Sequence, residues 1–161
     1  MSQSKNEYLD QVCLDACRVV EQKINTSAFC IVAIGGAMGG GKTLLSRYIS
    51  WKLRLSLLET DLFLRFIEPK VSYDFECIQE ILERKKVNKR NIIVEGSYIL
   101  PVLRKFDPNE IFLIHIENKI PSSPPAELID WGNTEHCAIN EILNMDCPAD
   151  LKVLAQHTIR W

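Results

Sequence analysis

Residues 34–43 read IGGAMGGGKT and combine the residue types that bind a phosphate chain. Gly36, four further residues and then Gly41, Lys42 and Thr43 fit the pattern G-x-x-x-x-G-K-[ST]. Glycines let successive backbone N–H groups converge on an anion, and the N-terminus of a following helix adds partial positive charge. Lys42 would reach the β- and γ-phosphates, and the Thr43 hydroxyl would bind Mg²⁺. The predicted nucleotide-binding residues are Gly36, Ala37, Met38, Gly39, Gly40, Gly41, Lys42, Thr43 and Leu44.

Two carboxylates stand where strands are expected to end, at the edge of a parallel sheet where ligands bind. Asp61 is interpreted as a general base that orients or deprotonates a substrate hydroxyl, or alternatively as a helix N-cap. Glu95 is expected to hold magnesium through water or to bind a substrate hydroxyl. Its alternative role is to pair with Lys42 or Arg65.

Short apolar runs alternate with helical patterns along the whole chain. Strands are predicted at 29–34, 55–59, 91–96, 111–116 and 150–155, and helices at 4–24, 42–52, 74–87, 98–105 and 126–144. This alternation predicts an α/β domain with a parallel sheet of about five strands. Residues 1–161 read as one domain, to which the helix at 4–24 is an addition. The phosphate-binding pattern follows a strand and opens a helix, which argues against an incidental glycine-rich turn.

The composition excludes disorder and a disulfide-dense miniprotein, since 47% of the 161 residues are hydrophobic and the six cysteines form no C-x-x-C pair. We expect reduced cysteines in a cytoplasmic protein, with no secretory signal, no membrane span and no nucleic-acid partner. The net charge of −2 hides a division along the chain. Residues 1–105 hold 16 Lys and Arg against 12 Asp and Glu, whereas residues 106–161 hold 3 against 9.

The order of these motifs resembles the uridine/cytidine kinase group of P-loop kinases, with nicotinamide riboside kinase and phosphoribulokinase nearby. The resemblance covers roughly residues 29–117 and consists of the glycine loop followed by ETDLFLR, YDFECIQEIL, NIIVEGSYIL and IFLIHIE. It implies a three-layer P-loop NTPase fold with strand order 2-3-1-4-5 and helices on both faces. It also implies transfer of the γ-phosphoryl group of ATP, as ATP–Mg²⁺, to a hydroxyl of a nucleoside-like acceptor. Asp61 would then be the base, and Phe63, Tyr73 and Glu95 would lie near the acceptor.

One part of the pattern is missing. Kinases of this group usually follow the fourth strand with an arginine-rich lid, but residues 107–150 contain Lys119 as their only Lys or Arg. An arginine that stabilises transition-state charge can be worth about 10³–10⁵ in rate. The cation would have to come from Lys119, Arg160, Arg65, Arg104 or a partner, or else catalysis is weak.

Three functions therefore remain open: a kinase of a small hydroxylated molecule, a nucleotide-binding protein with weak or no kinase activity, and an NTPase in which Glu95 positions water. Only about 29 residues separate Asp61 from the strand at 91, so we expect one helix, a short loop and a small acceptor. The sequence leaves open whether the chain forms a homodimer and whether the helix at 4–24 packs on its own domain.

Overall fold

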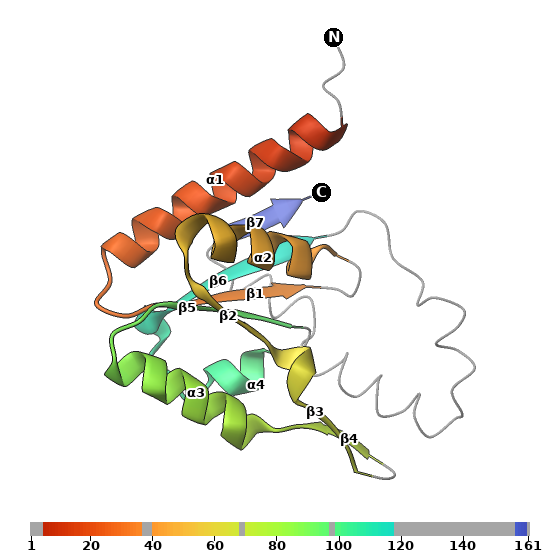
Figure 1. Ribbon diagram of the computed structural model, residues 1–161, viewed down its shortest axis with the longest axis vertical. Helices are drawn as coiled ribbons and strands as arrows, with labels where there is room; N and C mark the ends of the chain where they lie inside the picture. Colours follow the sequence, from red (N-terminus) through yellow and green to blue (C-terminus); the bar gives the residue numbers. More distant parts are fainter. Residues whose placement is uncertain (1–4, 37–39, 68–69, 97–98, 118–156, 161) are drawn as a thin grey trace, which may run out of the picture.

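The computed structural model describes residues 5–36, 40–67, 70–96, 99–117 and 157–160. Helices and strands alternate in the order expected of an α/β domain (Figure 1). The helices are α1 (Lys5–Asn25), α2 (Lys42–Leu53), α3 (Phe75–Val87) and α4 (Leu100–Leu103), with 3-10 turns η1 (Thr60–Phe63) and η2 (Pro108–Glu110). The strands are β1 (Ile31–Gly36), β2 (Ser56–Glu59), β3 (Leu64–Ile67), β4 (Lys70–Tyr73), β5 (Ile92–Glu95), β6 (Ile111–Glu117) and β7 (His157–Arg160).

Five of these strands form one parallel sheet in the order β2-β5-β1-β6-β7. Counted along the chain without the hairpin β3-β4, this is the predicted order 2-3-1-4-5, with β1 at the centre. The fifth place is taken by β7, at His157–Arg160. The strand predicted at 150–155 and the helix predicted at 126–144 lie outside the described residues.

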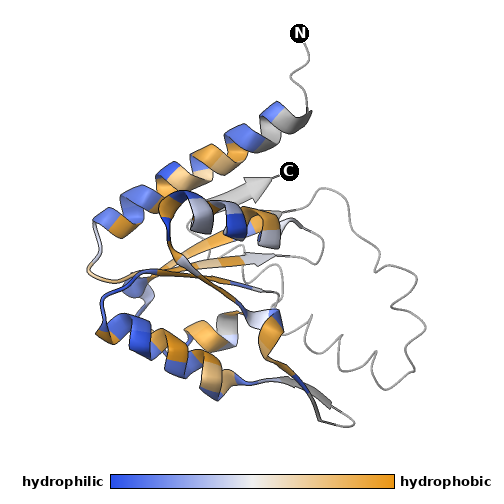
Figure 2. Cartoon of the chain, in the orientation of Figure 1, coloured by the Kyte–Doolittle hydropathy of each residue, from blue (hydrophilic) through white to orange (hydrophobic). Residues whose placement is uncertain are grey.

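Helices cover both faces of the sheet, which gives the three layers that were expected (Figure 1). On one face, α1 and α2 pack on a core formed by alternate residues of β1, β5 and β6, including Val32, Ile34, Ile93 and Ile114. On the other face, α3 and α4 cover the intervening positions, such as Ala33 and Val94. Because side chains alternate across a strand, burial on both faces requires continuous apolar runs. Figure 2 shows these runs as the apolar centre of the molecule.

The N-terminal helix α1 packs on its own domain. Its residues Cys13, Ala16, Cys17 and Val20 are buried together with Leu45 and Ile49 of α2. Their spacing of three and four residues is the apolar stripe that predicted the helix. The described part of the chain contains no helix that is both long enough and apolar enough to span a membrane.

The described cysteines, Cys13, Cys17, Cys30 and Cys77, are free thiols. Burial raises the pKa of Cys17 and of Cys30 to about 11. These thiols therefore stay protonated at neutral pH and serve as small apolar core residues.

Between η1 and α3 the chain forms an antiparallel hairpin of β3 and β4, where the sequence predicted only a short loop. Leu64 pairs with Tyr73 and Ile67 with Lys70. The hairpin leads directly into α3, whose N-cap is Asp74: its side chain accepts a hydrogen bond from the Cys77 backbone N–H at 3.2 Å. The region between Asp61 and β5 therefore holds a hairpin as well as the predicted helix.

Two helices end on residues with a left-handed backbone that is usually taken by glycine. Arg54 closes α2 at φ 54°, and Lys89 follows the C-cap of α3 at φ 51°. Asn88 is that C-cap, and its backbone N–H bonds to Arg84 O and Lys86 O.

Candidate active site

The candidate site lies where β1, β2 and β5 end and α2 begins. Gly36 is the last residue of β1 and has φ 141°, which side-chain-bearing residues rarely adopt. A Cβ built on Gly36 would lie 2.4 Å from the carbonyl oxygen of Ile116 on β6. The first glycine of the motif is therefore needed for the close approach of β1 to β6, as well as for any phosphate. Ala37, Met38 and Gly39 lie outside the described residues.

The second half of the motif opens α2. Gly41 is the N-cap with φ 84°, and its carbonyl accepts the first helical hydrogen bond from Leu45 N at 3.0 Å. Lys42 is buried, and its Nζ donates to the carbonyl oxygen of Gly36 at 3.0 Å. Its ammonium thus spans the loop from the start of α2 back to the end of β1. Gly40 is buried, whereas Leu44 points outward with 58% of its surface exposed.

Thr43 and Glu95 meet across the gap between α2 and the sheet. Thr43 Oγ1 donates to Glu95 Oε1 at 3.0 Å, and only 4% of Glu95 is exposed. Burial is the main reason that the pKa of Glu95 is raised. The negative charge of Asp61 adds to the rise, while the hydrogen bond from Thr43 and the charge of Lys42 oppose it. Hydroxyl and carboxylate oxygens are the hard donors that Mg²⁺ takes in nucleotide sites, so this pair fits the predicted metal.

Asp61 lies in η1, just after β2, with its side chain exposed. The Tyr73 hydroxyl, at the end of β4, donates to Asp61 Oδ1 at 3.1 Å. The alternative interpretation of Asp61 as an N-cap is wrong, since Glu59 holds the N-cap position of η1. Phe63, predicted near the acceptor, is half-buried and packs against the core beneath α3.

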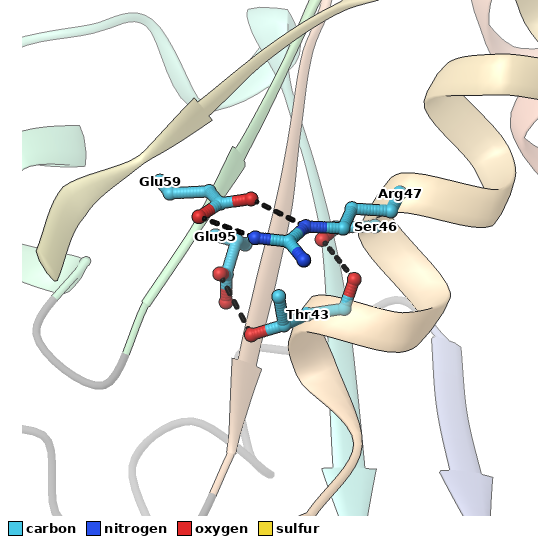
Figure 3. Close-up of polar contacts among 5 residues, drawn as sticks. All are labelled: Thr43, Ser46, Arg47, Glu59 and Glu95. Atoms are coloured by element: carbon cyan, nitrogen blue, oxygen red, sulfur yellow. Dashed lines mark hydrogen bonds and ion pairs between the residues drawn. The ribbon is translucent and has the colours of Figure 1, made fainter. Parts of the chain in front are cut away.

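An ion pair that the sequence did not predict joins α2 to β2. Arg47 donates to both oxygens of Glu59, from Nε to Oε1 at 2.8 Å and from Nη2 to Oε2 at 3.1 Å (Figure 3). Arg47 lies one helical turn after Thr43, and the pKa of Arg47 is raised mainly by its hydrogen bond to Glu59. No local pattern in the sequence signals this pair, because Arg47 and Glu59 belong to different elements that only the fold brings together.

A second ion pair involves one of the arginines considered as a catalytic cation. Arg65, in β3, contacts the carboxylate of Asp74, whose other oxygen caps α3. The alternative pairing of Glu95 with Arg65 is therefore not adopted. Lys119 lies outside the described residues.

Thr60 connects the ends of β2 and β5. Its side chain is completely buried, and its hydroxyl has no hydrogen-bond partner among the described residues. A Cβ placed on Gly96 would lie 1.8 Å from Thr60 Oγ1, so Thr60 fills the space that glycine leaves. This contact fixes the backbone after Glu95 against the residue before Asp61.

This protein shares its fold, and no closer relationship, with known kinases. No family model and no curated protein matches the sequence. Among solved structures, a possible uridine kinase from Bacillus stearothermophilus superposes with a TM-score of 0.63 at 15% identity, over 94% of this chain and 99% of that one. A protein assigned as a fructose transport system kinase from Silicibacter sp. TM1040 gives 0.53 at 16% identity, over 92% and 98%. The resemblance to the uridine kinase group of P-loop kinases is thereby confirmed at the level of fold.

Proposed function

We propose that this protein is an ATP–Mg²⁺-dependent phosphotransferase that acts on a hydroxyl group of a small, nucleoside-like molecule. The observation that supports this most strongly is the convergence of Lys42, Thr43 and Glu95 at the start of α2, with Asp61 at the end of the neighbouring strand. The kinase folds of the two structural neighbours agree with it.

Each residue has a role that its position supports. The backbone N–H groups at the N-terminus of α2 face the phosphate chain, and the Lys42 ammonium would move from Gly36 O to a phosphate oxygen. Thr43 and Glu95 would hold Mg²⁺, which neutralises charge on the phosphates when it is bound. Asp61 is exposed and would accept a proton from the substrate.

The reaction requires a single displacement. The acceptor hydroxyl gives its proton to Asp61 while its oxygen forms a bond to the γ-phosphorus. The bond from that phosphorus to the β–γ bridging oxygen breaks, and ADP leaves with the electron pair. Asp61 then returns the proton to solvent. Tyr73, by donating to Asp61 Oδ1, leaves the other carboxylate oxygen for the substrate.

A second candidate is a nucleotide-binding protein with weak or no kinase activity. It is favoured by the absence of Arg from residues 107–150 and by the engagement of Arg65 with Asp74 and of Arg47 with Glu59. Both guanidinium groups are already engaged by carboxylates.

The two candidates, and an NTPase as a third, are separated by measuring ADP release from ATP–Mg²⁺. The panel should contain nucleosides, other ribosides, pantothenate, simple sugars and no acceptor, with Lys42→Ala as the blank. ADP release that depends on one acceptor sustains the kinase, and release without acceptor indicates an NTPase. Nucleotide binding without ADP release under any condition supports the second candidate.

A further inference from the structure

Two glutamates lie side by side at the edge of the sheet that faces α2. Glu59 ends β2, Glu95 ends β5, and the parallel register pairs these two residues directly. Adjacent strands are about 4.8 Å apart, and paired residues point to the same face. Two carboxylates are thus placed at a spacing at which one cation could contact both.

The two carboxylates have different partners on α2, one helical turn apart. Thr43 donates one hydrogen bond to Glu95 and occupies a single oxygen, whereas the planar fork of Arg47 occupies both oxygens of Glu59 (Figure 3). A bidentate contact of this kind fixes the orientation of the Glu59 carboxylate and also compensates its charge. Only 20% of the Glu59 side chain remains exposed, so its carboxylate is held against Arg47.

From this arrangement we infer that Arg47 is a positioning residue that withholds Glu59 from the metal. Of the two paired carboxylates, only that of Glu95 then remains available to a divalent cation. Within the described ranges, no three His, Cys, Asp or Glu side chains are grouped so that they could hold a metal ion. One carboxylate and one hydroxyl bind Mg²⁺ weakly without phosphate oxygens, so the cation enters with its nucleotide. This inference rests on the proposed function of Thr43 and Glu95.

Loss of Arg47 has a definite consequence. Glu59 would be left without its cation beside Glu95, and the pair would form a two-carboxylate site of higher charge. Cation affinity rises with the charge of the ligand set. The protein would then bind a divalent cation without nucleotide, in a position that the phosphate chain does not set.

The test uses Mn²⁺ alone as the probe, added to nucleotide-free protein, with the loss of the free-ion EPR signal as readout. Wild type is expected to bind weakly, and Arg47→Ala about tenfold more tightly because a second carboxylate becomes available. The double variant Arg47→Ala/Glu59→Gln should return to the wild-type value. Arg84→Ala is the matched control, since Arg84 forms an exposed ion pair with Glu80 on α3. It should leave Mn²⁺ binding unchanged.

Unchanged Mn²⁺ binding by folded Arg47→Ala would overturn the inference, and so would tighter binding that persists in the double variant. Thermal unfolding of each variant reports whether it folds. If Arg47→Ala does not fold, Arg47→Lys takes its place in the test. Lysine keeps the positive charge but lacks the planar fork, so tighter Mn²⁺ binding than in wild type is again expected. Failure of the proposed function would appear elsewhere, as the absence of ATP–Mg²⁺ binding by wild type.

Discussion

The hydroxyl of Tyr73 lies 3.1 Å from Oδ1 of Asp61 and donates a hydrogen bond to it, from the last residue of the hairpin to the turn after β2. Tyr73 is itself buried, with 7% of its surface exposed, and packs in the core beneath α3. An exposed carboxylate is therefore oriented by a residue that the core holds in place. This is the arrangement expected of a proton acceptor whose direction matters.

Asp61→Asn should keep nucleotide binding and lose turnover. The amide has nearly the same shape but cannot accept the substrate proton, and general-base catalysis is worth about 10²–10⁴ in rate. Steady-state ADP release with the identified acceptor, together with titration of a fluorescent ATP analogue, measures both properties.

Tyr73→Phe is the graded comparison, because it keeps the carboxylate and removes one hydrogen bond worth about 1 kcal/mol. A rate loss of about fivefold is expected.

Equal rates for Asp61→Asn and wild type would remove Asp61 as the base.

Lys42→Ala should abolish the rise in thermal midpoint that ATP–Mg²⁺ gives to wild type. The ammonium that now binds Gly36 O belongs to a residue of the phosphate loop, and charge-assisted bonds to phosphate are among the strongest polar contacts. Lys52→Ala is the matched control, since Lys52 is on the same helix but is exposed beside the Trp51 ring. Identical nucleotide stabilisation in Lys42→Ala and Lys52→Ala would contradict the phosphate-loop assignment.

Glu95→Gln should make the metal-free protein more stable than wild type at neutral pH. The pKa of Glu95 is raised in the folded state, chiefly by burial, so the folded protein holds this proton more tightly than the unfolded chain does. Between the two pKa values, stability falls as pH rises, and the loss is complete above the folded pKa. The glutamine stays neutral and avoids this loss.

Urea unfolding of both proteins from pH 4 to pH 8, in EDTA, checks this expectation. The difference between them should shrink as the pH falls through the raised folded pKa of Glu95, and it should be absent below the unfolded value near 4.5. A difference that stays constant over the whole range would show that burial of the Glu95 charge does not affect stability.

Gly96→Ala should destabilise the protein by about 3 kcal/mol, because the new methyl group would overlap Thr60 Oγ1. Thr60→Ala removes that oxygen, which is buried without a partner among the described residues, and should cost only about 1 kcal/mol. In the double variant the clash is relieved in part. Its loss of unfolding free energy should therefore be smaller than the sum of the losses in the two single variants. Additive losses in urea unfolding would mean that the two residues do not contact each other.

The parts of the fold that the sequence predicted are those with strong, continuous patterns. Residues 31–34 and 92–94 are apolar on both faces, and the stripe from Cys13 to Val20 has helical spacing, so strand and helix follow from local periodicity. The glycine loop could also be recognised from the sequence, because a predicted strand precedes it and a predicted helix follows it.

The hairpin was missed although LRFI and KVSY flank Glu68-Pro69 in the sequence. A two-stranded hairpin is barely stable alone, and so short a pattern does not stand out from a loop. The place of β7 was missed for a related reason. An edge strand needs less apolar sequence, so HTIR at 157–160 was passed over in favour of DLKVLA at 150–155.

The partners of the site residues could be predicted only in part. Lys42 and Thr43 are defined by a local motif, but Arg47 finds Glu59 only because parallel pairing brings the end of β2 beside that of β5. Such a contact depends on the three-dimensional arrangement, and no spacing in the sequence encodes it.

The left-handed positions at Arg54 and Lys89 are places where substitution by glycine could raise the stability of the protein. Glycine takes this backbone conformation without strain, whereas a residue with a Cβ does not. Both positions follow helix ends at the opposite edge of the sheet from the phosphate loop. Arg54→Gly and Lys89→Gly would supply a sturdier parent protein in which costly substitutions at the site still leave enough folded material to assay.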